Sequence, residues 1–512
     1  MSKKVVIIGG GIGGLATAAL LAKAGLNVTI LEKQGIVGGR AGLHIAKGFT
    51  FDTGPSWLLM PEIFEHFYRL VGKDMQSELD LRRLTPAYRI FFEEDLKNPL
   101  DITGNEEQDR KTFETIEPGS GEKLGAYINR AEATYTIATE SFLYTNFTNY
   151  MKFLKIKTAR TLPTMINMSI RSIDSYVSNY VKDARLKKIL EYPMVFLGTS
   201  PYKAPALYHL MSYLDFRQGV YYPYGGMYKI IESIESIARS LDVKIQTNVS
   251  VEKILATSSK VTGVRCADGT EMNADIVISN ADLHFTETAL LDPEYQTYPA
   301  KYWRKKMPSP GAVLMYLGIK GSLPELTHHN LLFTEDWKTN FGKIFDLQEY
   351  PHPASMYICK PTATDKTVAP KNHENIFVLV PVAATTEMTK DEIGKHTESY
   401  IDQIIAMTGI SDLRERIVYK KIVDPIDFAN DLNAWRGSAL GLAHPLLQSA
   451  LWRPRNKSKK VTGLYYVGGN TLPGIGLPMC LIGSELIYKH LANDTSITPV
   501  LEIRDLSQEA NL

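Results

Sequence analysis

The chain begins Met1-Ser-Lys-Lys-Val5-Val-Ile-Ile-Gly9-Gly-Gly11-Ile-Gly-Gly14, where a short β-branched run leads directly into a glycine-rich turn. The apolar run over residues 4–8 predicts a strand buried on both faces. Residues 15–24 then predict a helix ending at Gly25, and residues 27–31 predict a second strand closed by Glu32. This order of strand, turn, helix, strand and acid predicts a Rossmann-type α/β domain that binds a dinucleotide.

Each part of this unit has a mechanical purpose. Gly9 permits the tight turn, Gly11 lets the backbone approach a pyrophosphate, and Gly14 lets the helix pack closely on the strand. The helix N-terminus presents free N–H groups and the positive end of its dipole to the phosphates. Glu32 lies where a carboxylate accepts both hydroxyls of a ribose. Because all the parts are in register, we prefer a dinucleotide site to a glycine-rich turn without a ligand.

The composition describes a large globular protein. The 512 residues suit two or three domains, and 44% of them are hydrophobic. Lys and Arg number 57 against 56 for Asp and Glu, a balance that argues against nucleic acid as a partner. The three cysteines, Cys266, Cys359 and Cys480, show neither a disulfide framework nor a zinc motif, which predicts a reducing compartment.

Two uncharged stretches, 5–22 and 461–484, imitate a signal peptide or a membrane span. Glycines interrupt the first, and glycines and prolines interrupt the second, which would leave backbone groups unpaired in hydrocarbon. We therefore predict no transmembrane helix, and a protein that is cytoplasmic or attached to a membrane from that side.

The organisation along the chain predicts interleaved domains. A composition shift near residue 100 is followed by predominantly helical sequence over 105–240, with long periodic stretches around 122–140, 171–192 and 226–240. Short strands with a hairpin turn at 267–270 follow over 243–278. Residues 310–420 mix strands and helices, and residues 463–469 predict a last buried strand before a helix that begins near Pro478.

Further motifs carry a family resemblance. Gly38-Gly39-Arg40 follows Glu32, as in the superfamily of FAD-dependent amine oxidases and carotenoid desaturases, and this favours FAD over NAD as the cofactor. Three segments resemble bacterial phytoene and diapophytoene desaturases in particular, and the similarity runs almost from end to end. They are residues 48–57, residues 427–439 with 448–454 downstream, and residues 467–478.

The resemblance implies a glutathione-reductase-like FAD-binding domain interleaved with an α+β substrate domain and a helical membrane-associating region. It implies FAD-binding parts at 1–100, 221–300 and 426–512, a helical substrate and membrane region at 101–220, and a substrate-domain sheet at 301–425. The residues expected to bind FAD are Gly9, Gly11, Gly13, Gly14, Glu32, Lys33, Gly38, Gly39, Arg40, Gly54, Pro55, Ser56, Val251, Asn280, Gly469, Pro478 and Met479.

The implied reaction is dehydrogenation of a carbon–carbon single bond in a polyene lipid, in carotenoid biosynthesis. We assign the catalytic acid or base to no residue. The family's flavin-side motif usually has His where this chain has Leu472, and residues 150–165 contain no aspartate to carry over as an acid or base. The 11 histidines show no metal-binding spacing, so we expect no metal; His328-His329 is interpreted as a polar surface pair.

Residues 141–173 contain five Lys or Arg, no Asp or Glu, and several interleaved aromatic residues. Cations with interfacial aromatics favour an anionic membrane surface, so we expect peripheral attachment on its cytoplasmic side through this segment. A second aromatic group is expected to belong mostly to the core, although it would suit a polyene tunnel. Its members are Tyr208, Tyr213, Phe216, Tyr221, Tyr222, Tyr224 and Tyr228.

Several alternatives stay open at this stage. C40 phytoene is the preferred substrate, with C30 diapophytoene and a carotenoid oxygenase reaction as alternatives. An amine oxidase or a protoporphyrinogen oxidase of the same superfamily is a further alternative, although a soluble amine oxidase would not need the basic aromatic stretch. A non-catalytic prenyl-lipid carrier of the GDP-dissociation-inhibitor type would not need an intact phosphate loop and Glu32. The number of desaturation steps, the electron acceptor and the oligomeric state are not encoded in any motif.

Overall fold

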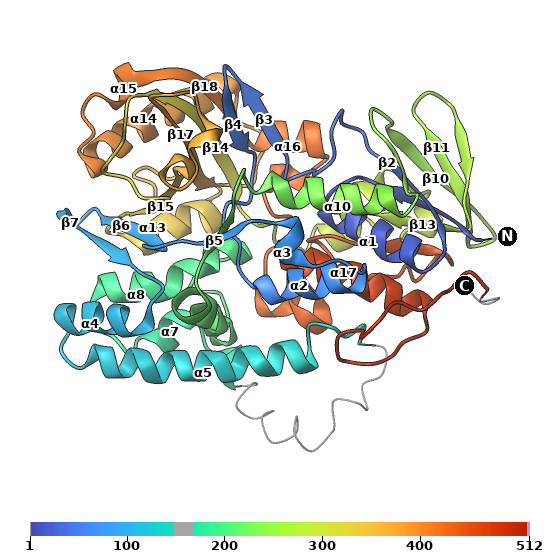
Figure 1. Cartoon of the computed structure of the whole chain (residues 1–512), viewed down its shortest axis with the longest axis horizontal. Helices are drawn as coiled ribbons and strands as arrows, with labels where there is room; N and C mark the ends of the chain where they lie inside the picture. The colour runs from blue at the N-terminus through green and yellow to red at the C-terminus, as the bar shows by residue number, and fades with distance from the viewer. Residues whose placement is uncertain (1, 148–166, 509–512) are drawn as a thin grey trace.

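A computed structural model describes residues 2–147 and 167–508 of the chain. The fold contains two large sheets, one of five strands and one of seven. Figure 1 shows them at opposite ends of the molecule, each packed against helices. Both ends of the described chain lie on the side of the five-stranded sheet.

The five-stranded sheet is parallel throughout and draws strands from the two ends and the middle of the chain. Its order is β19 (Leu464–Tyr466), β13 (Ile276–Ser279), β1 (Lys4–Ile8), β2 (Asn27–Leu31) and β9 (Lys244–Gln246). The predicted strands at 4–8 and 27–31 are confirmed, because both are apolar and buried in the centre of this sheet. The helix α1 (Ile12–Lys23) begins three residues before the predicted start and packs against α10 (Tyr228–Ser240) and α17 (Leu477–Leu491).

A small antiparallel sheet contains β10 (Val251–Thr257), β11 (Lys260–Cys266) and β12 (Glu271–Asn273). The hairpin turn predicted at 267–270 joins β11 to β12, with Gly269 in a left-handed conformation at φ 85°.

The seven-stranded sheet is mixed, with one parallel pair, β15 and β6. Its order is β18 (Ile417–Val423), β14 (Gly311–Lys320), β17 (His373–Val382), β16 (Met356–Cys359), β15 (His329–Phe333), β6 (Tyr88–Phe92) and β7 (Asp95–Ile102). The strand pairing thus divides the first hundred residues between the two large sheets, because β6 and β7 extend the second one.

Alternation along β14 explains why this sheet is covered on both faces. Val313, Met315 and Leu317 pack with α14 (Lys390–Thr408) on one side. Leu314 and Tyr316 point to the opposite side, into a core shared with the helical region.

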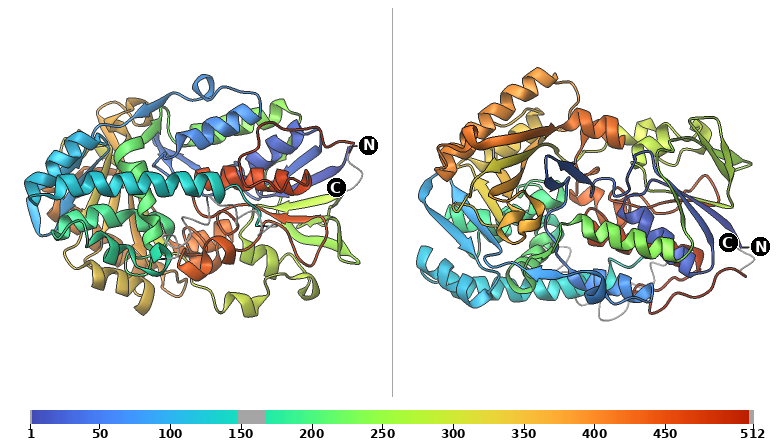
Figure 2. Two further views of the ribbon diagram at one scale, coloured as in Figure 1. Left: turned by 90° about the horizontal axis from the view of Figure 1, so that it is seen from below. Right: turned by 45° about the horizontal axis from the view of Figure 1, so that its top comes forward.

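The helical region contains α4 (Glu106–Ile116), α5 (Ser120–Ser141), α7 (Ile173–Val177) and α8 (Ala184–Glu191). The helix predicted around 122–140 is confirmed as α5, which runs toward α17 in Figure 2. The single helix predicted around 171–192 is wrong, because the chain leaves α7 and restarts at α8, where the Asp183 side chain accepts a hydrogen bond from the Arg185 N–H. None of the described helices is both long and apolar enough to cross a bilayer.

Short elements complete the fold between these layers. They are β3 (Leu43–Ala46), β4 (Phe49–Asp52), α2 (Pro61–Leu70), α3 (Met75–Glu78), β5 (Leu81–Arg83), α9 (Met211–Tyr213), β8 (Tyr221–Pro223), α11 (Leu283–Thr288), α12 (Ala300–Trp303), α13 (Trp337–Gly342), α15 (Leu413–Arg416) and α16 (Pro425–Leu432). Of the segment 141–173, residues 148–166 lie outside the described part of the chain.

Candidate flavin and substrate site

A cavity of about 1260 Å³ lies between the two large sheets. On one side it is lined at the carboxyl ends of the parallel strands, by Ile8, Leu31 and Ser279. On the other side it is lined by side chains of the seven-stranded sheet, such as Leu314 and Leu379. Ligands of open α/β sheets bind at this carboxyl edge, so the cavity is the candidate site.

The glycine-rich turn forms the floor of the cavity, and its spacing has a steric cause. A Cβ on Gly14 would lie 2.3 Å from the carbonyl oxygen of Gly9, so only glycine lets α1 pack this closely on the turn. A Cβ on Gly11 would lie 2.7 Å from the Asn280 side-chain oxygen. Gly11 caps α1 without a side-chain hydrogen bond and lines the cavity, which leaves the helix N-terminus facing it.

Glu32 is held rigidly at the end of β2. One carboxylate oxygen accepts the Gly10 N–H at 2.6 Å, and the other accepts the Gln34 N–H at 2.7 Å. Each oxygen keeps a second lone pair, so the buried carboxylate remains able to accept ribose hydroxyls.

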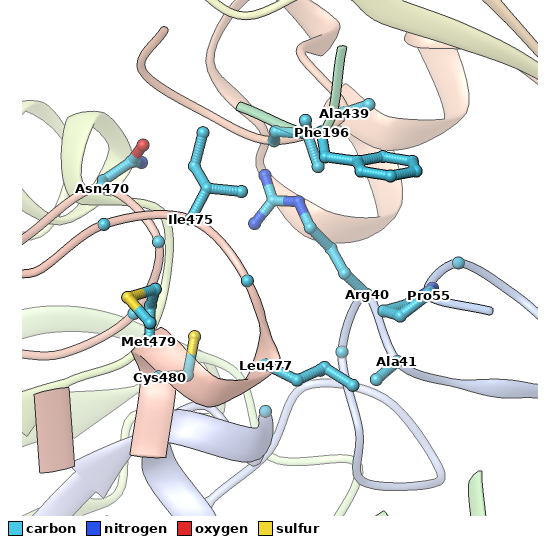
Figure 3. Close-up of a pocket in the computed structure, with 18 of the residues that line it drawn as sticks. Arg40, Ala41, Pro55, Phe196, Ala439, Asn470, Ile475, Leu477, Met479 and Cys480 are labelled. Atoms are coloured by element: carbon cyan, nitrogen blue, oxygen red, sulfur yellow. The ribbon is translucent and has the colours of Figure 1, made fainter. Parts of the chain in front are cut away.

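Gly38 and Gly39 lie against the glycine-rich turn, and Arg40 extends from them into the cavity. The Gly38 N–H donates to the Gly10 carbonyl at 2.8 Å. Figure 3 shows Arg40 reaching toward Ile475 of the C-terminal loop, with Phe196 beyond it. Its Nε and Nη2 are shielded from solvent, yet no described residue accepts a hydrogen bond from them, and the nearest carboxylate oxygen, of Asp282, is 3.9 Å from Nη2. A guanidinium left in this state suits an anionic group such as a diphosphate.

The C-terminal loop before α17 closes the cavity and is held by a buried arginine. Arg453 donates to the carbonyl oxygens of Leu442, Gln448, Gly469 and Thr471. Burial lowers its pKa to about 10, which still leaves it charged at neutral pH. Arg453 thereby joins residues 442–448 to the loop that leads into α17, whose first turn contains Pro478 and Met479.

The structure brings the predicted cofactor residues together. All of them line the cavity except Gly14, which lies behind the turn. The glycine cradle, the Glu32 carboxylate and the unpartnered Arg40 guanidinium fit the phosphates and ribose of a flavin dinucleotide. Which of these residues contact the cofactor stays a prediction.

The remaining wall of the cavity is apolar. Phe196, Leu331, Phe333 and Phe341 lie along it. Of the second aromatic group, only Tyr208 lines the cavity, whereas Phe216 and Tyr222 are fully buried in the core. A cavity with this lining is suited to a hydrocarbon chain.

The interpretation of His328 and His329 as a surface pair is wrong. Both are buried, because β15 lies inside the seven-stranded sheet between β16 and β6. His329 Nδ1 is 2.7 Å from the Tyr357 hydroxyl, which is 2.7 Å from the hydroxyl of Ser56 in the cavity wall. Burial lowers the pKa of both histidines, so they are neutral. Their ring nitrogens and the Cys359 thiol supply ligand atoms within 4.8 Å of one another.

Sequence reasoning missed Tyr357, Arg453 and His444, all of which are buried at or beside the cavity. Arg453 falls inside a segment that carries the resemblance, but nothing in its neighbours shows that it binds four carbonyls. His444 stands alone in the sequence, so no spacing marks it.

Comparison with known proteins identifies the family. The sequence pattern of flavin containing amine oxidoreductases matches residues 12–482. A carotenoid 3,4-desaturase of Haloarcula japonica is 40% identical over 492 residues, covering 96% of this chain and 98% of the relative. A zeta-carotene-forming phytoene desaturase of Myxococcus xanthus is 33% identical over 506 residues, covering 97% and 96%.

Solved structures share the fold. An oxidoreductase from Methanosarcina mazei superposes with a TM-score of 0.60 over 94% of this chain and 99% of its own, at 19% identity. With the cavity, the family pattern and the full-length relatives taken together, the chain belongs to the flavin containing amine oxidoreductase family and, within it, to the carotenoid desaturases.

Proposed function

We propose that this protein is an FAD-dependent desaturase that removes two hydrogens from a CH–CH bond of a carotenoid. The observation that carries the proposal is the continuity of the cavity. One wall holds Gly11, Glu32 and Arg40, and the opposite wall is made of apolar side chains of the seven-stranded sheet. A flavin dinucleotide and a hydrocarbon chain therefore have room beside each other in one space.

FAD is preferred to FMN because of the groups at the end of β2. Glu32 and Val251 both line the cavity there, and only a dinucleotide has a second ribose and an adenine for them to contact. Arg40 would hold the diphosphate between the two halves.

When bound, the flavin supplies the acceptor for a hydride from the substrate. The chain's own residues position the substrate and exclude water. The apolar wall holds the hydrocarbon by burial, at roughly 25 cal/mol per Å² of apolar surface removed from water, and keeps water from the reacting carbons.

Two carotenoid substrates have specific support. The overall resemblance of the chain to phytoene desaturases, such as the Myxococcus xanthus relative, favours C40 phytoene. The relative at 40% identity is named a carotenoid 3,4-desaturase, which favours the 3,4 bond of a more conjugated carotenoid. C30 diapophytoene and an oxygenase reaction are further outcomes of the same assay.

The assay supplies phytoene, diapophytoene or a conjugated carotenoid in liposomes with FAD and follows the pigments extracted over time. We expect a more conjugated product, whose absorption spectrum counts the new double bonds. Glu32→Ala should lose most of this activity through weaker FAD binding, whereas Glu271→Gln, on exposed β12, should not. FAD-loaded protein that changes none of the carotenoids would overturn the proposal. Colourless protein that cannot be loaded with FAD would favour a prenyl-lipid carrier.

We further propose that the protein attaches to the cytoplasmic side of a membrane near the mouth of the cavity. Ile170, Leu451 and Trp452 line the cavity and are 74%, 42% and 52% exposed. Exposed apolar side chains beside a lipid-sized cavity provide a route for a substrate dissolved in the bilayer. The three cysteines are unpaired, which agrees with a reducing compartment.

Sedimentation with anionic vesicles tests the attachment. Changing Leu451 and Trp452 to serine should weaken vesicle binding about tenfold, because two apolar anchors are lost. The matched control is Leu501→Ser, since Leu501 is 91% exposed but does not line the cavity. Equal binding of both variants would contradict a docking role for this surface.

A further inference from the structure

His444 is a buried imidazole in the cavity wall, beside the C-terminal loop. A Cβ on Gly474 would lie 2.5 Å from its Nε2, so the ring packs directly against the backbone of this loop. Residues 474–480 line the same cavity, and Arg453 joins the segment that carries His444 to Gly469 and Thr471, which precede them in the loop. His444 therefore stands where the C-terminal loop meets the substrate space.

The tautomer of His444 follows from its one hydrogen bond. Nδ1 lies 3.1 Å from the Leu197 carbonyl oxygen, and a carbonyl only accepts, so Nδ1 carries the proton. Nε2 then has a free lone pair. No described residue hydrogen-bonds to Nε2, and it is not among the polar atoms that are sealed from solvent without a partner, such as the Nε2 atoms of His328 and His329. Nε2 is therefore the nitrogen of this cavity-wall residue that has no hydrogen-bond partner among the described residues.

The surroundings keep this imidazole neutral. Burial, and then the positive charge of Arg453, hold the pKa of His444 well below its ordinary value. The ring of Tyr208 meets the imidazole edge-on, at 6.3 Å between centroids. A neutral imidazole with a free nitrogen is a base at every pH at which the protein is expected to work.

We propose that Nε2 of His444 accepts the proton that a carotenoid loses as its new double bond forms. This inference rests on the proposed function. One C–H bond would break so that its hydrogen leaves with both electrons of the bond, as the hydride for which bound flavin would supply the acceptor. The adjacent C–H bond then breaks, its electron pair becomes the π bond, and its proton goes to Nε2. Water later removes that proton from the imidazolium.

The low basicity of His444 is sufficient for this role. A carbon chain that has lost a hydride is cationic, and the proton on its neighbouring carbon is strongly acidic, so a weak base accepts it readily. The Tyr357 hydroxyl, on the same wall, is less suited to accept the proton. The Tyr357 hydroxyl already lies within hydrogen-bond distance of Ser56 and His329, and burial raises the pKa of Tyr357 well above its ordinary value.

The test replaces His444 with glutamine and with alanine in the FAD-loaded protein, with rates expressed per bound flavin. We expect turnover to fall by roughly 100-fold or more, because general bases typically contribute that much. Added imidazole should restore part of the rate to His444→Ala but none to His444→Gln. FAD affinity, measured by flavin fluorescence, should change less than about threefold.

The matched control is His209→Gln. His209 is also buried, with Nδ1 3.0 Å from the Ala206 carbonyl, but it does not line the cavity, so turnover should stay within about twofold. A second readout is the histidine ¹⁵N NMR signal that His444→Gln removes. It should report a protonated Nδ1 and an unprotonated Nε2 between pH 6 and 8.

Near-normal turnover of His444→Gln, or no rescue of His444→Ala by imidazole, would overturn the inference. An Nε2-protonated tautomer in the NMR spectrum would overturn it as well. These results are distinguishable from failure of the proposed function, in which wild-type, flavin-loaded protein desaturates no carotenoid at all.

Discussion

Glu191, at the end of α8, is a carboxylic acid in the protein interior. It is 3% exposed, and one of its oxygens has no hydrogen-bond partner among the described residues. Burial raises its pKa to about 8, so the folded protein keeps it protonated at neutral pH while the unfolded chain ionises it near pH 4.5. Its contribution to stability is therefore fully present below pH 4.5 and is lost as the pH rises through about 8.

Glutamine is uncharged and similar in shape to the protonated acid, so Glu191→Gln should not lose stability as the pH rises. We expect the free energy of unfolding of Glu191→Gln, relative to that of the wild type, to increase between pH 5 and pH 9 by on the order of 4 kcal/mol. Urea denaturation at several pH values measures it, with exposed Glu271→Gln as the control. A difference that does not vary with pH would contradict the assignment.

At the scale of single residues, sequence predicted those whose role follows from local spacing. Gly11 and Glu32 belong to a motif, and the structure places both at the cavity. His444 and Tyr357 have no such motif, because their neighbours in the cavity come from distant parts of the chain. His329 is buried by contacts with segments distant in sequence. The prediction that it lies on the surface rested on its polarity and was therefore wrong.

At the scale of elements, the contact between α1 and the turn after β1 depends on Gly14. An alanine Cβ there would meet the Gly9 carbonyl oxygen at 2.3 Å, and a backbone atom cannot move aside without shifting the helix. We expect Gly14→Ala to cost about 2 kcal/mol or more in stability and to weaken FAD binding, since the helix N-terminus would be displaced.

Gly394→Ala is the matched control for that change. Gly394 lies within α14, and an added Cβ there meets nothing within 4 Å. Alanine should stabilise this helix by up to about 1 kcal/mol. Urea denaturation and flavin titration compare the two variants, and similar effects of both would show that the close contact is unimportant.

Helices and strands with a strong local sequence pattern were predictable. Helices that are divided within a continuous pattern were not. Residues 4–8 and 27–31 are apolar strands whose neighbours are also apolar, and they form as predicted. Residues 171–192 keep a helical periodicity, but the cap at Asp183 divides them into α7 and α8. Pairing of β6 with β15 joins segments about 240 residues apart in number, and no local pattern carries that information.

At the scale of the whole molecule, the cavity is lined by both large sheets, so its ligand should stabilise them together. Protein stripped of flavin should melt several degrees lower than holoprotein, because FAD at about 100 times its Kd adds about 2.7 kcal/mol. Thermal unfolding with FAD, FMN or no flavin measures this. FMN at the same concentration should give a smaller shift, since it lacks the adenosine half. An unchanged melting temperature with FAD would contradict this cavity as the flavin site.

Because the cavity is undivided, FAD should have to bind before the hydrocarbon substrate does. Cofactor and hydrocarbon share one cavity with no wall between their two sides, so a hydrocarbon that enters first would be free to lie across the side where the cofactor binds. A lipid or detergent tail bound in the cofactor-free cavity would block binding of the dinucleotide. We therefore expect protein produced in flavin-depleted cells to contain lipid in this cavity. Added FAD should then bind and restore activity only after that lipid has been removed.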